Sequence, residues 1–349
     1  MRGREVGRGP VREPGLTAGA PAPVPHAALL RTFLSGDRRA CARLITLAEE
    51  GDPAFAALYD QIFERVGRAA RTGLTGPPGA GKSTLADRLI EHHRRAGRRV
   101  GVVAVDPTSP FTGGALLGDR IRMKSAATDE AVFVRSMATR GSLGGLSRSA
   151  VEACDVLDAF GCDEILVETV GVGQAEVDVV VASDTVVVVL HPGAGDGVQA
   201  MKAGLAEIGE VFVVNKCDLP GADRLASDLE GALELAARRG SWKPPVVQAA
   251  AAEGRGTDEV VAAIERHRAH LRETGAFEGA RRTKRAAHLR RVAEERLRAL
   301  IFDEKGYGRA LASALDGGGR GPYAVVGEIL ESLRARLPEA PHRERSDGR

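Results

Sequence analysis

The chain has 349 residues and is 43% hydrophobic, which is enough apolar material for a sizeable core. A formal net charge of +2 and an aromatic content of 4% give no argument for a nucleic-acid partner, because they indicate neither a strongly basic surface nor stacking platforms. No apolar run reaches the ~20 uncharged residues that span a bilayer, and the four cysteines share no C-x-x-C spacing. We therefore predict a cytoplasmic protein with reduced thiols that binds neither nucleic acid nor membrane.

The composition changes along the chain in a way that predicts its organisation. Residues 1–26 are rich in Gly, Pro and Arg, which predicts a disordered tail. Residues 27–70 carry apolar side chains at helical spacing and predict an N-terminal helical extension. Residues 71–272 alternate apolar strands with helical segments, which predicts an α/β fold with a mostly parallel sheet flanked by helices. The strand candidates are 98–106, 131–137, 163–170, 185–191, 211–216 and 245–250.

The remaining part, residues 273–337, is expected to form a C-terminal helical arm. Its long helix covers 281–302, where Leu289, Val292, Leu297 and Leu300 fit one amphipathic face. A glycine-rich break precedes a last short helix, and the polar residues 338–349 are predicted to be a disordered tail.

The segment from Gly76 to Ser83 fits the phosphate-binding pattern G-x-x-x-x-G-K-[ST]. Its glycines let successive backbone N–H groups point at a phosphate, and the start of the next helix adds the positive end of its dipole. Lys82 is expected to reach the β- and γ-phosphates, and the Ser83 hydroxyl to bind Mg²⁺. The alternative is a chance glycine-rich turn before a helix. The predicted nucleotide contacts here are Gly76, Pro77, Pro78, Gly79, Ala80, Gly81, Lys82, Ser83 and Thr84.

Two acidic residues lie at the end of, and after, the first predicted strand, 98–106. Asp106 ends the apolar run Val102–Val105, and Asp119 lies further along the same loop system. Two carboxylates beside a phosphate site suggest Mg²⁺ binding or positioning of the attacking water. The alternatives are simple strand termination by Asp106 and helix capping by Asp119.

A third acidic residue, Glu168, ends the predicted strand 163–170 and is followed by small residues. Glu168 is placed to hold the metal through a water or to orient the attacking water. The Gly171 N–H is placed to sense the γ-phosphate, so we predict that 171–176 rearrange on hydrolysis of the nucleotide.

The base is predicted from Asn215-Lys216-Cys217-Asp218, which follows a buried apolar run. The Asp218 carboxylate can accept two hydrogen bonds from the ring N–H and the exocyclic amine of guanine, a donor pair that adenine lacks. Lys216 can lay its stem along the base, and the Asn215 amide can tie this loop to the phosphate loop. The sequence therefore predicts a GTP/GDP site.

These motifs together resemble the MeaB/ArgK-type GTPases, chaperones of adenosylcobalamin-dependent acyl-CoA mutases such as methylmalonyl-CoA mutase. The resemblance runs over roughly residues 40 to 335 and implies a GTPase that converts GTP and water to GDP and phosphate. It also implies a signal-recognition-particle-like P-loop core, helical extensions that support a homodimer, and a mutase partner. The matching segments are Gly76–Thr84, Ala104–Pro107, Leu117–Met123, Arg140–Gly145, Glu168–Gln174 and Gly195–Gly204.

One segment departs from the family pattern. The family usually carries a Ser-Ala pair in the loop behind the guanine, whereas this chain has alanine throughout 249–252. Backbone N–H groups of Ala250 and Ala251 can still meet the guanine carbonyl. We therefore expect weaker anchoring of this loop rather than a loss of specificity.

Two other functions share parts of the pattern. An ATP- or GTP-dependent kinase linked to amino-acid transport would need a catalytic base and an acceptor pocket, and the sequence offers no candidate beyond the predicted switch acids. A metal-insertion GTPase would need a Cys/His cluster, which the sequence lacks. We expect instead a chaperone that gates cofactor loading and protects or reactivates the mutase.

Overall fold

The structure, a computed structural model, describes residues 24–106, 129–138, 145–169, 175–193, 205–236, 242–302, 307–308 and 321–336. The chain divides into two compact units, residues 1–280 and 281–349, and each is described by itself. The expected tail 338–349 and residues 1–23 of the expected N-terminal tail lie outside the described residues. The division of residues 27–272 into an extension and a core remains a proposal.

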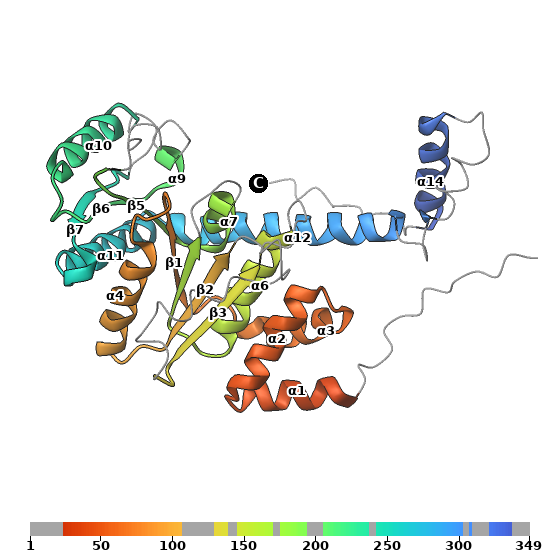
Figure 1. Ribbon diagram of the computed structural model, residues 1–349. Helices are drawn as coiled ribbons and strands as arrows, with labels where there is room; N and C mark the ends of the chain where they lie inside the picture. The colour runs from red at the N-terminus through yellow and green to blue at the C-terminus, as the bar shows by residue number, and fades with distance from the viewer. Residues whose placement is uncertain are drawn as a thin grey trace, which may run out of the picture. The chain divides into compact units, whose positions relative to one another are not determined.

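Within the described residues, seven strands form one sheet in the order β3-β2-β4-β1-β5-β6-β7, and all adjacent pairs are parallel (Figure 1). The predicted mostly parallel sheet is confirmed. Because the strands run the same way, their carboxyl ends meet at one edge, where such sheets bind ligands. The strands are β1 (Ala70–Thr75), β2 (Val100–Asp106), β3 (Val132–Ala138), β4 (Glu164–Thr169), β5 (Thr185–Leu190), β6 (Val211–Asn215) and β7 (Val246–Ala249).

β1, which lies between β4 and β5, is absent from the strands predicted above. Its sequence lacks an apolar run because Arg71, Thr72 and Gly73 interrupt it. The structure explains the last two of these residues. Thr72 is 1% exposed and accepts a hydrogen bond from Arg268 at 2.8 Å. A Cβ at Gly73 would lie 2.2 Å from Cγ1 of Val179, so glycine lets a helix pack directly on this strand.

Helices cover both faces of the sheet. On one face, α4 (Lys82–Arg95) and α11 (Thr257–Glu273) bury an apolar cluster that includes Leu85, Leu89 and Ile264. On the other face lie α6 (Gly145–Ala159), α7 (Ala175–Ala182) and α10 (Ala222–Ala236). The side chains of neighbouring strand residues alternate between the two clusters, as a sheet buried on both sides requires. Short helical turns cover Phe63–Arg65, Ala206–Ile208 and Ala251–Glu253.

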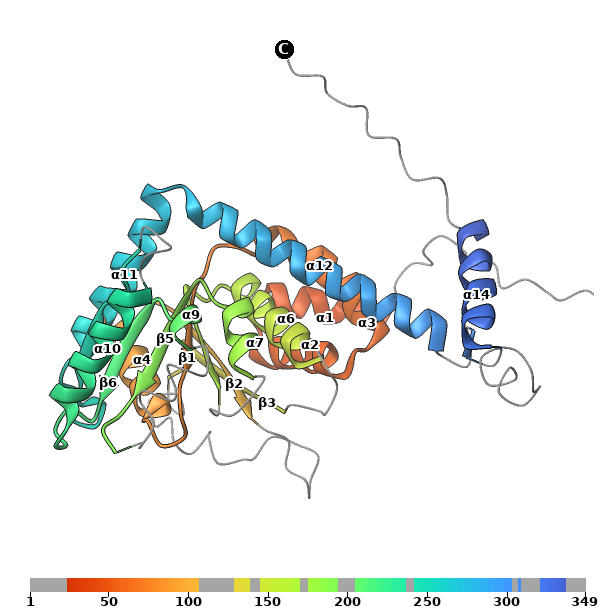
Figure 2. The same cartoon turned by 90° about the horizontal axis from the view of Figure 1, so that it is seen from above.

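The N-terminal helices are α1 (Val24–Leu34), α2 (Arg38–Glu50) and α3 (Pro53–Ile62). Asp37 and Asp52 cap α2 and α3 by accepting backbone N–H bonds in the first turn of each helix. Leu44, Leu58 and Ile62 are buried in the cluster that also contains the apolar side of α6. Figure 2 shows α1 to α3 next to α6, with α7 on the other side of α6.

Buried ion pairs fix these helices to the sheet. Arg71 donates to Asp155 at 2.7 Å and to Asp158 at 3.1 Å, and Tyr59 of α3 donates to Asp155 at 2.5 Å. Asp158 also accepts the backbone N–H groups of residues 67–69, which lead into β1. Burial lowers the pKa of Arg71, but the carboxylates of Asp155 and Asp158 help to raise it well above its usual range. This guanidinium therefore stays charged.

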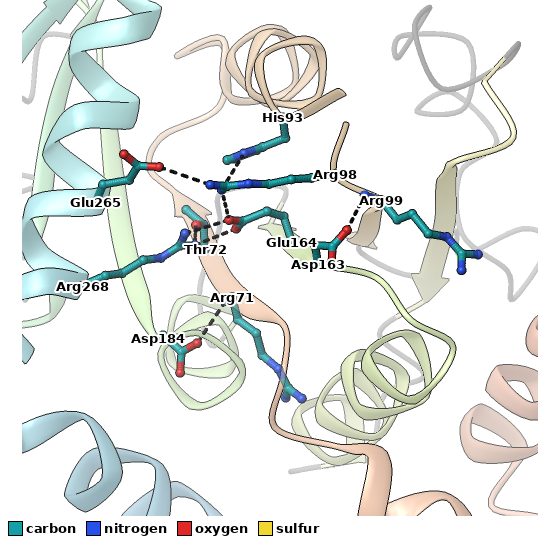
Figure 3. A network of polar contacts seen from close by, with 10 residues as sticks. All are labelled: Arg71, Thr72, His93, Arg98, Arg99, Asp163, Glu164, Asp184, Glu265 and Arg268. Atoms are coloured by element: carbon teal, nitrogen blue, oxygen red, sulfur yellow. Dashed lines mark hydrogen bonds and ion pairs between the residues drawn. The ribbon is translucent and has the colours of Figure 1, made fainter. Parts of the chain in front are cut away.

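A second polar network lies at the amino ends of β1 and β4, away from the carboxyl edge (Figure 3). Glu164 is 2% exposed and accepts hydrogen bonds from Arg98 at 2.7 Å and from Arg268 at 3.0 and 2.9 Å. Arg98 also contacts Glu265, and Arg268 donates to Thr72. The network therefore joins α11 to the segment that follows α4 and to both strands.

His93 gives this network a pH dependence. The ring is 4% exposed, and burial lowers its pKa to about 4, with Arg268, Arg98 and His92 also lowering it and Glu164 opposing them. Below pH ~6.5 the unfolded chain protonates His93, whereas the folded chain does so only near the lowered pKa of about 4. We expect this group to remove about 3 kcal/mol of stability between pH ~6.5 and ~4. Urea denaturation measured at several pH values checks this.

The matched variant is His93→Leu, which keeps a buried apolar side chain and removes the titrating ring. Its stability is expected to fall less steeply with acidification than that of the wild type. Equal slopes for both proteins would contradict a buried neutral His93.

The second unit contains most of α12 (Ala276–Phe302) and α14 (Pro322–Arg336). Leu289 is 70% exposed and Leu297 52% exposed, so apolar side chains of α12 face solvent in the isolated chain. Tyr307 contacts Ser332 of α14 through their hydroxyl groups at 2.9 Å. Within the described residues, no helix combines the length and apolar character needed to cross a bilayer.

Candidate functional site

The phosphate loop, residues 76–81, connects β1 to α4 at the carboxyl edge of the sheet. Gly76 has a φ of 133°, and a Cβ there would lie 2.0 Å from the carbonyl oxygen of Val189. Gly81 has a φ of 86°, and a Cβ there would lie 2.3 Å from Nδ2 of Asn215. Both positions therefore require glycine, for backbone conformation and for close approach.

Lys82 begins α4, and its ammonium folds back over the loop. Nζ donates to the carbonyl oxygen of Gly76 at 2.9 Å and to that of Pro77 at 3.1 Å. The residue is 6% exposed, so a positive charge is held beside the amino end of α4. Both features favour an anion at this place. Of the other predicted loop contacts, Pro78, Gly79 and Thr84 are exposed, Pro77 is half-buried and Ala80 is buried.

Ser83 and Glu168, predicted as metal ligands, lie in contact. The Ser83 hydroxyl donates to Oε1 of Glu168 at 2.5 Å, and Glu168 is 4% exposed near the carboxyl end of β4. Glu168 pairs across the sheet with Leu74 of β1, which explains how residues so far apart in sequence meet. A hydroxyl and a carboxylate are the hard oxygen ligands that Mg²⁺ takes, usually one or two from the protein, with phosphates completing its shell. The donor set therefore fits Mg²⁺.

Asn215 joins three segments of the site. It ends β6, is 2% exposed, and its Nδ2 donates to the carbonyl oxygen of Ala80 in the phosphate loop at 2.8 Å. Its Oδ1 accepts the N–H of Ala251 at 3.0 Å. The predicted tie between the Asn215 amide and the phosphate loop is confirmed.

Lys216 and Asp218 follow at the same edge. Lys216 has a φ of 57°, a left-handed conformation that no other non-glycine residue adopts within the described ranges. Its carbonyl accepts the N–H of Leu219 at 2.9 Å, which closes a tight turn. Asp218 lies exposed in this turn. Strain of this kind in a surface turn beside the phosphate loop is typical of a binding site.

The segment 250–256 lies beside Asn215. Ala250 and Ala251 are each 1% exposed, and the N–H of Ala250 donates to the carbonyl oxygen of Arg255 at 3.0 Å. Because the N–H of Ala251 donates to Asn215, the two N–H groups expected to meet the guanine carbonyl are both engaged within the protein. Arg88 of α4 donates to the carbonyl oxygens of Ala251 at 2.9 Å and Ala252 at 3.0 Å. Arg88 is not among the predicted site residues, because an arginine on a helix outside any motif resembles an ordinary solvated side chain.

The remaining predicted residues are less completely described. Asp106 ends β2 and pairs with Ala138 of β3 through its backbone. Its side chain is not among those that the structure describes. Asp119 and Gly171 lie outside the described residues altogether. Within the described parts of the chain, no three His, Cys, Asp or Glu residues gather as a metal-binding group. The roles of Asp106, Asp119 and Gly171 therefore stay predictions.

The phosphate loop follows a strand of a parallel sheet and lies close to the contact of Ser83 with Glu168 and to Asn215. These features together define a phosphate-loop nucleotide-binding protein. A family model described as "Methylmalonyl Co-A mutase-associated GTPase MeaB" matches residues 41–305. GTPase ArgK of Escherichia coli is 36% identical over 288 residues, which cover 80% of this chain and 87% of ArgK.

A mouse relative, "Methylmalonic aciduria type A homolog, mitochondrial", is 34% identical over 285 residues, covering 76% of this chain and 69% of the relative. The crystal structure of an LAO/AO transport system kinase superposes with a TM-score of 0.66 at 28% identity, covering 90% of this chain and 100% of that one. The chain belongs to the MeaB family of methylmalonyl-CoA mutase-associated GTPases. It is a P-loop GTPase of the predicted fold class and binds guanine nucleotides.

Proposed function

We propose that this GTPase is a chaperone of an adenosylcobalamin-dependent acyl-CoA mutase of the methylmalonyl-CoA mutase type. The observation that carries the proposal is the family match over residues 41–305, since the family is described as mutase-associated. The proposed role is to gate cofactor loading and to protect or reactivate the mutase. GTP binding and hydrolysis would set which of two states the partner meets.

The proposed site follows from the contacts above. Lys82 would neutralise charge on the β- and γ-phosphates. Ser83 and Glu168 would hold Mg²⁺, and the ion would supply charge stabilisation for phosphoryl transfer. Asp106 and Asp119 complete the proposed set of acids for metal binding or water positioning. Asn215, Lys216 and Asp218, together with the N–H of Ala252, recognise guanine.

The geometry also supports a nucleotide-dependent switch. Glu168, in contact with Ser83, lies just before the segment 170–174, and α7 begins directly after it. A Cβ at Gly73 would lie 2.2 Å from Val179 and 2.5 Å from the Ser183 hydroxyl, so α7 is packed tightly on the strand that leads to the phosphate loop. Movement of α7 therefore requires repacking against β1. We propose that Gly171 senses the γ-phosphate and that α7 transmits its state.

The same proposal includes a homodimer formed through the arm 273–337 and a cytoplasmic location. The exposed leucines of α12 support the first, because an apolar helix face of this kind is suited to burial against a partner. The free cysteines, with Cys41, Cys154 and Cys162 buried, support the second. Burial raises the pKa of each of these three thiols, so they are inert thiols rather than reactive ones.

The proposal is tested by steady-state GTP hydrolysis with and without purified methylmalonyl-, isobutyryl- and ethylmalonyl-CoA mutases. We expect slow hydrolysis by the protein alone and ~10³-fold faster hydrolysis at saturating concentrations of the right mutase, as when a partner completes a GTPase site. The mutase should also bind the GTP and GDP states with different affinities. A rate unchanged by every mutase, with equal GTP and GDP titrations, would contradict the chaperone role.

A further inference from the structure

The segment Ala250–Ala252, here called the guanine loop, is held through its backbone alone. Its three side chains are methyl groups, which form no hydrogen bonds. The N–H of Ala250 donates to Arg255, and the N–H of Ala251 donates to Asn215. The carbonyl groups of Ala251 and Ala252 both accept hydrogen bonds from Arg88, and that of Ala251 also accepts the N–H of Gly254 at 3.2 Å.

Arg88 is suited to this task by the shape of its head group. Nε donates to Ala251 at 2.9 Å and one terminal nitrogen to Ala252 at 3.0 Å, while the other terminal nitrogen donates to Glu91 at 2.9 Å. A planar guanidinium fixes two successive peptide groups at once, which a lysine cannot do. Because a peptide N–H points opposite to its C=O, the bond to Ala251 directs the N–H of Ala252 away from α4.

The position of Arg88 in the fold adds a connection between the two halves of the site. α4 begins with Lys82 and Ser83, at the phosphate loop, and carries Arg88 further along the same rigid helix. The guanine loop is thereby fixed to the helix that presents the phosphate ligands. Its other long-range anchor, Asn215, also reaches the phosphate loop through Ala80. Both anchors thus set the spacing between the phosphate end and the base end of the site.

We infer that Arg88 is a positioning residue for guanine recognition. It holds the guanine loop so that the N–H of Ala252 meets the 6-oxygen of the base. Arg88 itself does not touch the nucleotide. The inference rests on the proposed guanine site of Asn215, Asp218 and the guanine loop, and it adds a residue that acts through that loop.

The test measures dissociation constants of the full-length protein for GTP, 6-thio-GTP and ITP, by competition with a fluorescent GDP analogue. Sulfur is a weaker acceptor than oxygen, so 6-thio-GTP reports on the N–H groups that meet the 6-position. ITP lacks the 2-amino group and reports on Asp218. Arg88→Met keeps the side-chain stem and removes every donor. Glu91→Gln is the matched control, because it weakens the surface pair and leaves both carbonyl contacts in place.

We expect Arg88→Met to weaken GTP binding ~10-fold, equivalent to one hydrogen bond, and 6-thio-GTP binding by less. The preference for GTP over 6-thio-GTP therefore falls, whereas the preference for GTP over ITP is kept. Arg88→Lys lies between Arg88→Met and the wild type, and Glu91→Gln matches the wild type. This pattern goes beyond a structural role, which would weaken all three nucleotides equally.

Equal weakening of GTP, 6-thio-GTP and ITP, or no change at all, would overturn the inference. If Arg88→Met does not fold, Arg88→Lys decides, and wild-type ratios in that variant overturn it. Failure of the proposed site is distinguishable, because it shows in proteins that retain Arg88. A wild type that binds ATP as tightly as GTP, or an Asp218→Asn variant with no shift toward XTP, would contradict the guanine site itself.

Discussion

Replacing Lys82 with methionine is expected to lower GTP hydrolysis by at least ~10²-fold, the cost of removing one preorganised charge or donor from a developing phosphoryl transition state. Methionine keeps most of the side-chain length and removes the ammonium. In the structure this ammonium donates hydrogen bonds to the carbonyl oxygens of Gly76 and Pro77, in the loop where the phosphates are proposed to bind. The measurement is single-turnover GTP hydrolysis, with circular dichroism to show that the fold is kept.

The matched control is Lys243→Met. Lys243 forms an exposed ion pair with Glu234 at 2.9 Å, so the substitution removes the same charge away from the phosphate loop. Wild-type hydrolysis is expected in this control. If Lys82→Met also hydrolyses GTP at the wild-type rate, the assignment of the phosphate loop is wrong. A loss confined to Lys82→Met separates a local role from a general effect of net charge.

The parts of the site that the sequence predicts are those carried by short motifs at strand ends. The phosphate loop, Glu168 and Asn215 each follow a strand of a parallel sheet, so their approach at one edge follows from topology. The contact of Ser83 with Glu168 and that of Asn215 with Ala80 agree with this expectation. The assigned chemistry of these residues goes further than the contacts and stays a proposal.

Long-range polar contacts of residues outside these motifs are what the sequence does not predict. β1 was missed because Arg71 and Thr72 make it look like a loop, although both are paired in the folded chain. Arg88 lies 163 and 164 residues before the two carbonyl groups that it binds in the guanine loop. Neither spacing nor composition signals such a pair. The partners of these side chains can be identified only in the folded structure, in which α4 and α11 lie on the same face of the sheet.

The pair of Glu164 and Arg268 is a contact of this kind, buried at both side chains, and breaking it is expected to cost about 3–5 kcal/mol of stability, the value for removing one partner of a buried ion pair. Glu164→Gln changes the shape little and removes the charge. Arg268, only 5% exposed at its side chain, then keeps its positive charge without a carboxylate opposite it. Arg98 is 40% exposed and can turn to solvent, so most of the cost falls on Arg268.

The double variant Glu164→Leu with Arg268→Met tests the cause, because replacing both charges by apolar groups removes the uncompensated charge. We expect it to recover most of the stability that Glu164→Gln loses. Glu234→Gln, on the exposed pair with Lys243, is the control and should change the free energy of unfolding by less than ~1 kcal/mol. Guanidinium denaturation of the full chain provides the values, fitted to the first transition if the two units unfold separately. A Glu164→Gln variant whose free energy of unfolding lies within ~1 kcal/mol of the wild-type value would show that the network is not a main support of the sheet. A double variant as unstable as Glu164→Gln would show that the loss comes from packing rather than from charge.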